Sequence, residues 1–268
     1  MFFKDFLNLV PKKHGAWSIF FISIIIGTLY SKNFKPIPFF LLLISSLSAF
    51  LLKENISLFI KLKKEDKKKF IFKILLIYLF LIISTFLTLI LLYKFYLLIP
   101  ISVISIFIIL ISFYFSLNKK ELTITAEIFG IFGLSLLLPS FYYISKGLID
   151  KDVIFLFIFV FLFFTGSIFH VRYIVRNKNI LSKNFWERLK VGKYSLLYHT
   201  FFFVISIYLS SKNYLPSTIY LAILPTLFKS YFFVLNKFKE PLPIKKVGFI
   251  ELFTSIAFTL ILIGTLTF

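Results

Sequence analysis

The chain has 268 residues, of which 59% are hydrophobic, 21% are aromatic and only 16% are charged. A soluble domain has about 45 to 50% apolar and about 25% charged residues, so this composition excludes an ordinary water-soluble fold. Lys and Arg number 31 against 11 Asp and Glu, which gives a net charge of +20. The basic residues lie between apolar runs, so they do not indicate binding to nucleic acid. The chain has no Cys, which excludes disulfides and Cys metal ligands.

Nine apolar runs follow one another along the chain, and each is bounded by charged or turn residues. A helix needs about 20 apolar residues to cross about 30 Å of hydrocarbon, and the runs lack the alternation of barrel strands. They predict an all-α, polytopic transmembrane helical bundle that forms one domain over residues 1–268. Eight spans are the alternative, because the first, second and seventh runs are short. The predicted spans are residues 16–30, 36–52, 70–92, 95–117, 122–144, 153–171, 194–210, 214–235 and 247–268.

The connections predict the orientation of these spans. With a cytoplasmic N-terminus, 23 basic residues fall in the inner segments and 6 in the outer connections. Because Lys and Arg are enriched on the cytoplasmic side, we expect the N-terminus inside and the C-terminus outside, in the inner (plasma) membrane. Two inner connections are long, Lys53 to Lys69 and Arg172 to Lys193. They are expected either to cover the inner mouth of the bundle or to anchor it at the interface.

Ionisable side chains inside the predicted spans are the sharpest functional signal, because each costs about 2.5 to 3.5 kcal/mol at the centre of a span. All of them lie near predicted cytoplasmic ends, which predicts a cavity that faces the cytoplasm. The alternative is a set of ion pairs that only hold helices together. Glu127 and His199 are the candidate acid and base. The other members are His170, Lys229 and Glu251, with His14 just before the first span.

Basic residues at the same membrane face favour recognition of an anion. Lys13, His14, Arg172 and Arg176 are all donors, and Arg binds a phosphate or carboxylate bidentately. The alternative is that Arg172 and Arg176 contact only lipid headgroups. Trp17, His170, Lys229 and Glu251 complete the candidate substrate site. No two His are spaced i, i+4 on one helix, so neither a tight metal site nor a cofactor is expected.

The segment Pro11-Lys12-Lys13-His14-Gly15-Ala16-Trp17 resembles the entry to the first span in the YwiC-like family of bacterial membrane proteins. Glu127 with Gly130, and residues 171–176 (VRYIVR), resemble later signatures of that family. The resemblance implies membership and no established activity.

The layout is also similar, more distantly, to UbiA-type intramembrane prenyltransferases, with nine helices and a cytoplasm-facing cavity. Those enzymes hold magnesium with two aspartate-rich motifs, whereas the matching stretches here, residues 51–55 and 170–177, contain no Asp. The inner loops offer only scattered carboxylates among Lys, so we expect no magnesium-dependent prenyl transfer. Whether the chain is an enzyme stays open.

Two functions remain from different classes. The first is binding or modification of an anionic or isoprenoid lipid in the inner cavity, with membrane lipids and their anionic headgroups as partners. The second is transport of a small anion or metabolite, proton-coupled through Glu127 and His199. The outer half carries almost no ionisable residue and no inverted repeat is visible, so the first is favoured.

Overall fold

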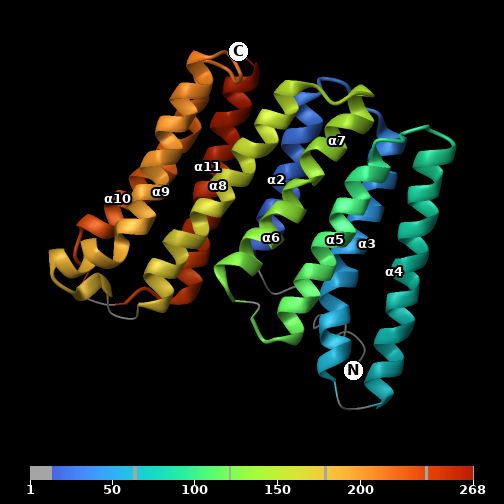
Figure 1. Ribbon diagram of the computed structural model, residues 1–268, viewed down its shortest axis with the longest axis horizontal. Helices are drawn as coiled ribbons and strands as arrows, with labels where there is room; N and C mark the ends of the chain where they lie inside the picture. Colours follow the sequence, from blue (N-terminus) through green and yellow to red (C-terminus); the bar gives the residue numbers. More distant parts are fainter. Residues whose placement is uncertain (1–13, 63–64, 121, 178–179, 239–240, 268) are drawn as a thin grey trace. The chain divides into compact units, whose positions relative to one another are not determined.

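The computed structural model describes residues 14–62, 65–120, 122–177, 180–238 and 241–267, and the elements in these residues are helices. Figure 1 shows them in chain order. The α-helices are α2 (His14–Tyr30), α3 (Pro36–Lys61), α4 (Glu65–Leu91), α5 (Leu98–Leu117), α6 (Ile124–Ser135), α7 (Leu137–Lys146), α8 (Lys151–Arg176), α9 (Phe185–Ser211), α10 (Leu224–Leu235) and α11 (Ile244–Thr267). Two short 3₁₀ helices, η1 (Ile180–Ser182) and η2 (Ile219–Ile223), precede α9 and α10.

Local side chains define where several helices begin and end. Asp150 begins α8, because its side chain accepts a hydrogen bond from the amide of Val153 at 3.1 Å. Asn184 caps α9 in the same way through the amide of Glu187 at 2.9 Å. Gly147 ends α7 with φ at 89°, a left-handed conformation that glycine adopts without steric cost. The chain therefore specifies these ends with ordinary capping chemistry.

The predicted fifth span consists of two helices, α6 and α7, which meet at Leu136. Pro139 explains the break, because proline has no amide proton to give to the carbonyl of Ser135 four residues earlier. Gly27 of α2 lies against the backbone of this second helix, since a Cβ at Gly27 would collide with the carbonyl of Leu138. A glycine is therefore required where α2 and α7 approach each other.

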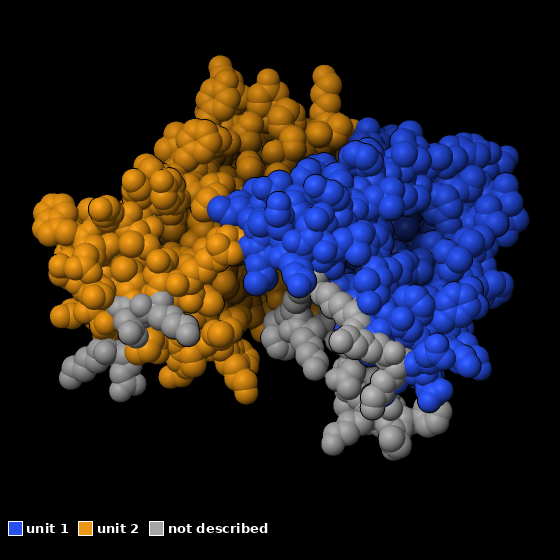
Figure 2. All heavy atoms as spheres, turned by 60° about the horizontal axis from the view of Figure 1, so that its bottom comes forward, with its two compact units in different colours: residues 1–13, 27–149 blue, residues 14–26, 150–268 orange. Residues whose placement is uncertain are grey.

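Figure 2 colours the two compact units into which the chain divides. Of the described residues, those within 27–149 belong to unit 1, and those within 14–26 and 150–268 belong to unit 2. In unit 1, α3 packs along α4 and also contacts α5 and α7, while α5 packs against α6. In unit 2, α9 packs against α8 and α10, and α11 packs against α8, α10 and η2.

Seven helical segments of the described chain are long and apolar enough to cross a membrane. They are residues 36–60, 65–91, 98–117, 124–146, 151–176, 185–211 and 244–266. Two further apolar helices, Gly15–Tyr30 and Ile219–Leu235, are shorter. Apolar side chains along α4 and α5 are widely exposed, for example Phe80 at 70% and Phe107 at 63%. Water would not tolerate such surfaces on so many helices, so the protein is a multi-pass integral membrane protein, as the composition predicts.

Several helices extend beyond the predicted spans. Helix α3 extends from Pro36 to Lys61, and α4 begins at Glu65, so most of the predicted connection Lys53 to Lys69 is helical. The predicted connection Arg172 to Lys193 likewise contains the end of α8, η1 and the first two turns of α9. The predicted spans end at the first basic residues of each connection. Charged residues, however, readily continue a helix beyond the hydrocarbon region.

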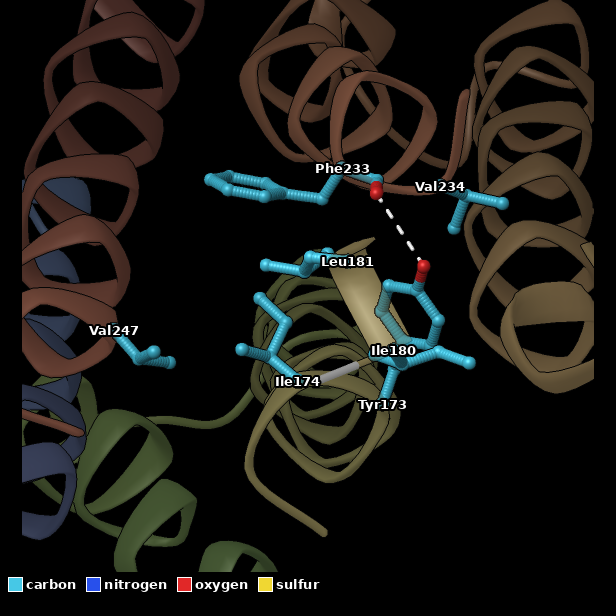
Figure 3. Packing of buried hydrophobic residues seen from close by; sticks show 7 residues of the cluster. All are labelled: Tyr173, Ile174, Ile180, Leu181, Phe233, Val234 and Val247. Atoms are coloured by element: carbon cyan, nitrogen blue, oxygen red, sulfur yellow. Dashed lines mark hydrogen bonds between the residues drawn. The ribbon is translucent and has the colours of Figure 1, made fainter. Parts of the chain in front are cut away.

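The interior of unit 2 is rich in aromatic rings. Phe163 of α8 stacks on Phe258 of α11 with 3.6 Å between ring centroids, and Phe159 packs against both Phe258 and Phe202. A second cluster joins the end of α8 to η1 and α10, with the hydroxyl of Tyr173 donating to the carbonyl of Phe233 (Figure 3). Helices α8, α9 and α10, which contribute to these apolar contacts, also carry buried polar residues.

A buried polar cluster in unit 2

The inward faces of α8 to α11 carry polar residues at helical spacing. In α10 the buried residues Thr226, Lys229, Ser230 and Phe233 follow one stripe. In α9 the stripe runs from Arg188 through Gly192 and Ser195 to His199. Spacings of three and four residues place such side chains on one face of a helix. The packing of α9 on α8 and α10, and of α11 on α8 and α10, therefore gathers polar groups inside unit 2.

Lys229 of α10 and Glu251 of α11 form the central ion pair. The Nζ atom of Lys229 lies 2.7 Å from Oε1 of Glu251, and the two side chains are only 4% and 14% exposed. The ammonium also lies 3.4 Å from Oγ1 of Thr254. The other carboxylate oxygen, Oε2 of Glu251, is buried and has no hydrogen-bond partner among the described residues. Pairing permits two charges to persist in a buried position, where either one alone would be costly.

His170 of α8 approaches the same carboxylate oxygen of Glu251 as Lys229 does. Its Nε2 atom is 3.8 Å from Oε1 of Glu251, and its ring packs edge to face against Phe233 with 5.3 Å between centroids. The side chain is fully buried, and neither ring nitrogen has a hydrogen-bond partner in the described part of the chain. One oxygen of Glu251 thus faces two basic residues from different helices.

His199 of α9 is buried but is held differently. Its Nδ1 atom donates to the carbonyl of Ser195 at 2.7 Å, which fixes that proton on Nδ1 because a carbonyl oxygen can only accept. Its Nε2 atom lies against Gly166, where an added Cβ would come within 3.0 Å. Beside it, the hydroxyls of Ser195 and Ser230 are 2.8 Å apart and link α9 to α10. In the sequence, Ser195 lies one helical turn before His199, and Ser230 directly follows Lys229. These positions could have identified the serine pair.

An open groove between α10 and α11 reaches the ion pair. Its volume is about 600 Å³. Lys229 and Thr254 are the two polar residues that line it, and the rest of the wall is apolar. The apolar lining residues are Pro225, Phe228, Phe232, Phe233, Phe249, Ile250, Leu252, Phe253, Ile256 and Ala257. The groove can therefore bind an apolar chain next to one buried ammonium group.

Arg188 is a buried residue whose role the sequence does not reveal. Its guanidinium donates to the carbonyls of Val234 at 3.0 Å, Leu235 at 2.7 Å and Lys183 at 2.7 Å. Two of these carbonyls end α10, where the last turn of a helix leaves acceptors without helical partners. Arg188 therefore caps α10 and ties it to the start of α9, although the sequence places it in an interfacial loop.

The remaining predicted site residues of unit 2 lie at the end of α8. Arg172 is half-buried, and Arg176 is exposed. Arg176 lines a second, smaller pocket of about 480 Å³ together with Lys183, Glu187 and Lys190. Lys183 is 4.0 Å from Glu187 within that pocket. The pocket is an exposed, mainly basic surface at the end of the unit.

Glu127 is half-buried in the first turn of α6, which belongs to unit 1. Arg172, Arg176 and His199 belong to unit 2, so their proximity to Glu127 stays a prediction. Trp17 of α2 is half-buried and stacks on Phe21 with 5.7 Å between centroids. Lys13 and the side chain of His14 lie outside the described residues. The structure thus brings together His170, Lys229 and Glu251, with His199 nearby, from the predicted set.

A family model described as YwiC-like protein matches residues 10–142. Over these residues the chain belongs to the YwiC-like family. The match includes the motif from Pro11 to Trp17 and also Glu127 and Gly130, so the resemblance read from the sequence is confirmed there. The YwiC-like match ends before α8, and the buried polar cluster lies outside it. No curated protein and no solved structure matches the chain.

The described residues contain no group of three or more His, Asp or Glu side chains that could hold a metal ion. Near the groove, Glu251 is the one carboxylate described, and Lys229 already neutralises it. The described side chains of this cluster pair charges inside an apolar surrounding.

Proposed function

We propose that this YwiC-like protein binds an anionic lipid of the inner membrane in the groove between α10 and α11. The groove carries the proposal. Its volume is in the range of ordinary ligand sites, about 300 to 1,000 Å³. A water-soluble metabolite would need several polar partners, and the groove supplies only Lys229 and Thr254. A lipid chain matches the apolar walls, and a negatively charged head matches the ammonium of Lys229.

The proposal includes the finer architecture expected from the sequence. Nine spans result if α2 and the segment from η2 through α10 also cross the membrane. The distribution of basic residues supports an inside N-terminus and an outside C-terminus. Lys229 and Glu251 then lie toward the cytoplasmic ends of their helices, so the lipid enters from the inner leaflet. A periplasmic reporter enzyme fused after Phe268 should be active; an inactive fusion would reverse this orientation.

Transport of a small anion is the second candidate function, and the buried ion pair favours it. Ionisable groups inside membrane spans often mark ion or proton pathways, and Lys229, Glu251 and His170 are such a group. The walls of the groove, however, are apolar along most of their length. Lipid binding therefore accounts for more of the observed residues than passage of a hydrated anion. Catalytic roles for Glu127 and His199 stay predictions.

Filling the groove tests the proposal. Ala257 lines it, and Leu260 of the same helix is 65% exposed and lies outside it. In native mass spectra of protein extracted in mild detergent, the wild type should retain an anionic lipid. Ala257→Trp should lower the lipid-bound fraction at least about tenfold, because the indole occupies the space of a chain, whereas Leu260→Trp should leave it unchanged.

The result against the proposal is equal lipid retention by wild type and Ala257→Trp. Ile256→Trp provides a second variant, since Ile256 lines the groove and is 47% exposed. Both variants and the control should elute as folded protein in size-exclusion chromatography.

A further inference from the structure

The carboxylate of Glu251 is shared between two basic residues in a way that the proposed function does not use. Its Oε1 atom lies 2.7 Å from Lys229 and 3.8 Å from His170. Lys229 is one of the residues that line the groove, whereas His170 is fully buried and does not line it. Oε2 of Glu251 and both nitrogens of His170 have no hydrogen-bond partner among the described residues. A buried polar group without a hydrogen-bond partner is unfavourable, so the cluster has unused bonding capacity.

Charge balance determines what this cluster can accept. With a neutral His170, the charges of Lys229 and Glu251 cancel. An anion that binds Lys229 competes with Glu251 and leaves one negative charge in excess inside an apolar surrounding, which is strongly unfavourable. A proton on His170 removes the excess, because the imidazolium can pair with the carboxylate that Lys229 has released. The result is two neutral pairs, lipid anion with Lys229 and Glu251 with His170.

The surroundings of His170 identify it as the acceptor of that proton. The ionisable groups that face it are Lys229 from α10, Glu251 from α11 and His199 from α9, which is close enough to interact with its charge. The Nδ1–H group of His199 already donates a hydrogen bond to the carbonyl of Ser195. Of the two histidines, only His170 lies within 4 Å of the carboxylate as an ion-pair partner among the described residues.

We propose that the groove binds a lipid whose head carries a single negative charge, and that each bound lipid is accompanied by uptake of one proton at His170. This inference rests on the proposed lipid binding. The proton comes from the aqueous phase, and Nε2–H of His170 then donates to Glu251. A diphosphate head with several charges would leave the cluster unbalanced, so monoanionic phosphodiester or carboxylate heads are selected.

Proton uptake makes the affinity depend on pH with a known sign. Binding that takes up one proton strengthens as pH falls, by up to about tenfold per pH unit, because the two equilibria are reciprocally linked. A phosphodiester keeps its single negative charge throughout the neutral and mildly acidic range, so the lipid head does not itself take up a proton there. A groove that merely contains a fixed positive charge would show no such dependence.

The test uses the purified full chain in neutral detergent between about pH 5.5 and about pH 8. Fluorescent phosphatidylglycerol is the probe, and fluorescent phosphatidylcholine is the zwitterionic control; across this range the charge of neither headgroup changes. For the wild type, phosphatidylglycerol affinity should fall at least about tenfold across this range, and phosphatidylcholine affinity should stay constant. His170→Gln should bind phosphatidylglycerol with an affinity independent of pH. His199→Gln should keep the wild-type slope.

The outcomes separate the two proposals. If phosphatidylglycerol does not bind the wild type at any pH, the proposed function fails. If it binds with constant affinity, lipid binding stands and proton uptake is refuted. A slope lost in His199→Gln but kept in His170→Gln would overturn the assignment to His170. Calorimetry of the wild type in buffers of different ionisation enthalpy should give close to one proton per lipid, and a value near zero contradicts the inference even if His170→Gln does not fold.

Discussion

Replacing Lys229 by Met is expected to destabilise the protein by about 3 to 5 kcal/mol, because it leaves the carboxylate of Glu251 buried without its partner. Glu251→Gln should be similarly costly, since it leaves the ammonium of Lys229, which is 4% exposed, without a counter-charge. The measurement is the free energy of unfolding in mixed micelles of increasing denaturing detergent.

The double variant Lys229→Met with Glu251→Gln distinguishes pairing from other causes. It removes both charges together, so its cost should be smaller than the sum of the single costs by at least about 2 kcal/mol. Lys212→Met is the control, because Lys212 is exposed at the end of α9 and should change stability by no more than about 0.5 kcal/mol. Strictly additive costs would show that the two side chains act independently.

Arg188→Met is the second substitution with a large expected effect, about 3 kcal/mol. It removes three hydrogen bonds and leaves the carbonyls of Val234 and Leu235 without their donor. Arg188→Lys should recover only part of the loss, because one ammonium cannot reproduce the planar fork that reaches both carbonyls. The same unfolding measurement applies.

The control for Arg188 is Lys190→Met, which removes a basic residue two positions away that is exposed. It should lower stability by less than about 0.5 kcal/mol. Equal losses for Arg188→Met and Lys190→Met would mean that the effect comes from the overall charge of this helix end and not from capping of α10.

The sequence predicts the broad class of fold well because composition and run length act at the level of the whole chain. An all-helical membrane protein follows from the apolar runs, whatever their packing. The break at Leu136 is less visible, since Pro139 lies inside an otherwise continuous apolar run. The position of Lys61 inside α3 is also hard to predict, because Lys both ends a membrane span and continues a helix well.

The sequence identifies the ionisable residues of the cluster but not their partners. Lys229, Glu251 and His170 stand out because charge is rare inside spans. Which of them meet depends on the rotation and offset of α8, α10 and α11 about their axes. These are set by contacts such as the stacking of Phe163 on Phe258, which pairs residues 95 positions apart in the sequence. For the same reason the groove, which requires two specific helix faces, has no signature in the sequence.

Photocrosslinking in living cells tests the central claim most directly, that the groove between α10 and α11 binds an anionic lipid. A photoreactive p-benzoylphenylalanine at Phe253, which lines the groove and is 74% exposed, is compared with one at Leu260 of the same helix, which is 65% exposed outside it. At Leu260 the crosslinked lipids should reflect the bulk membrane. At Phe253 one anionic lipid class should be strongly enriched, and enrichment should disappear with Lys229→Met. Identical lipid profiles at the two positions would contradict a specific lipid site in the groove.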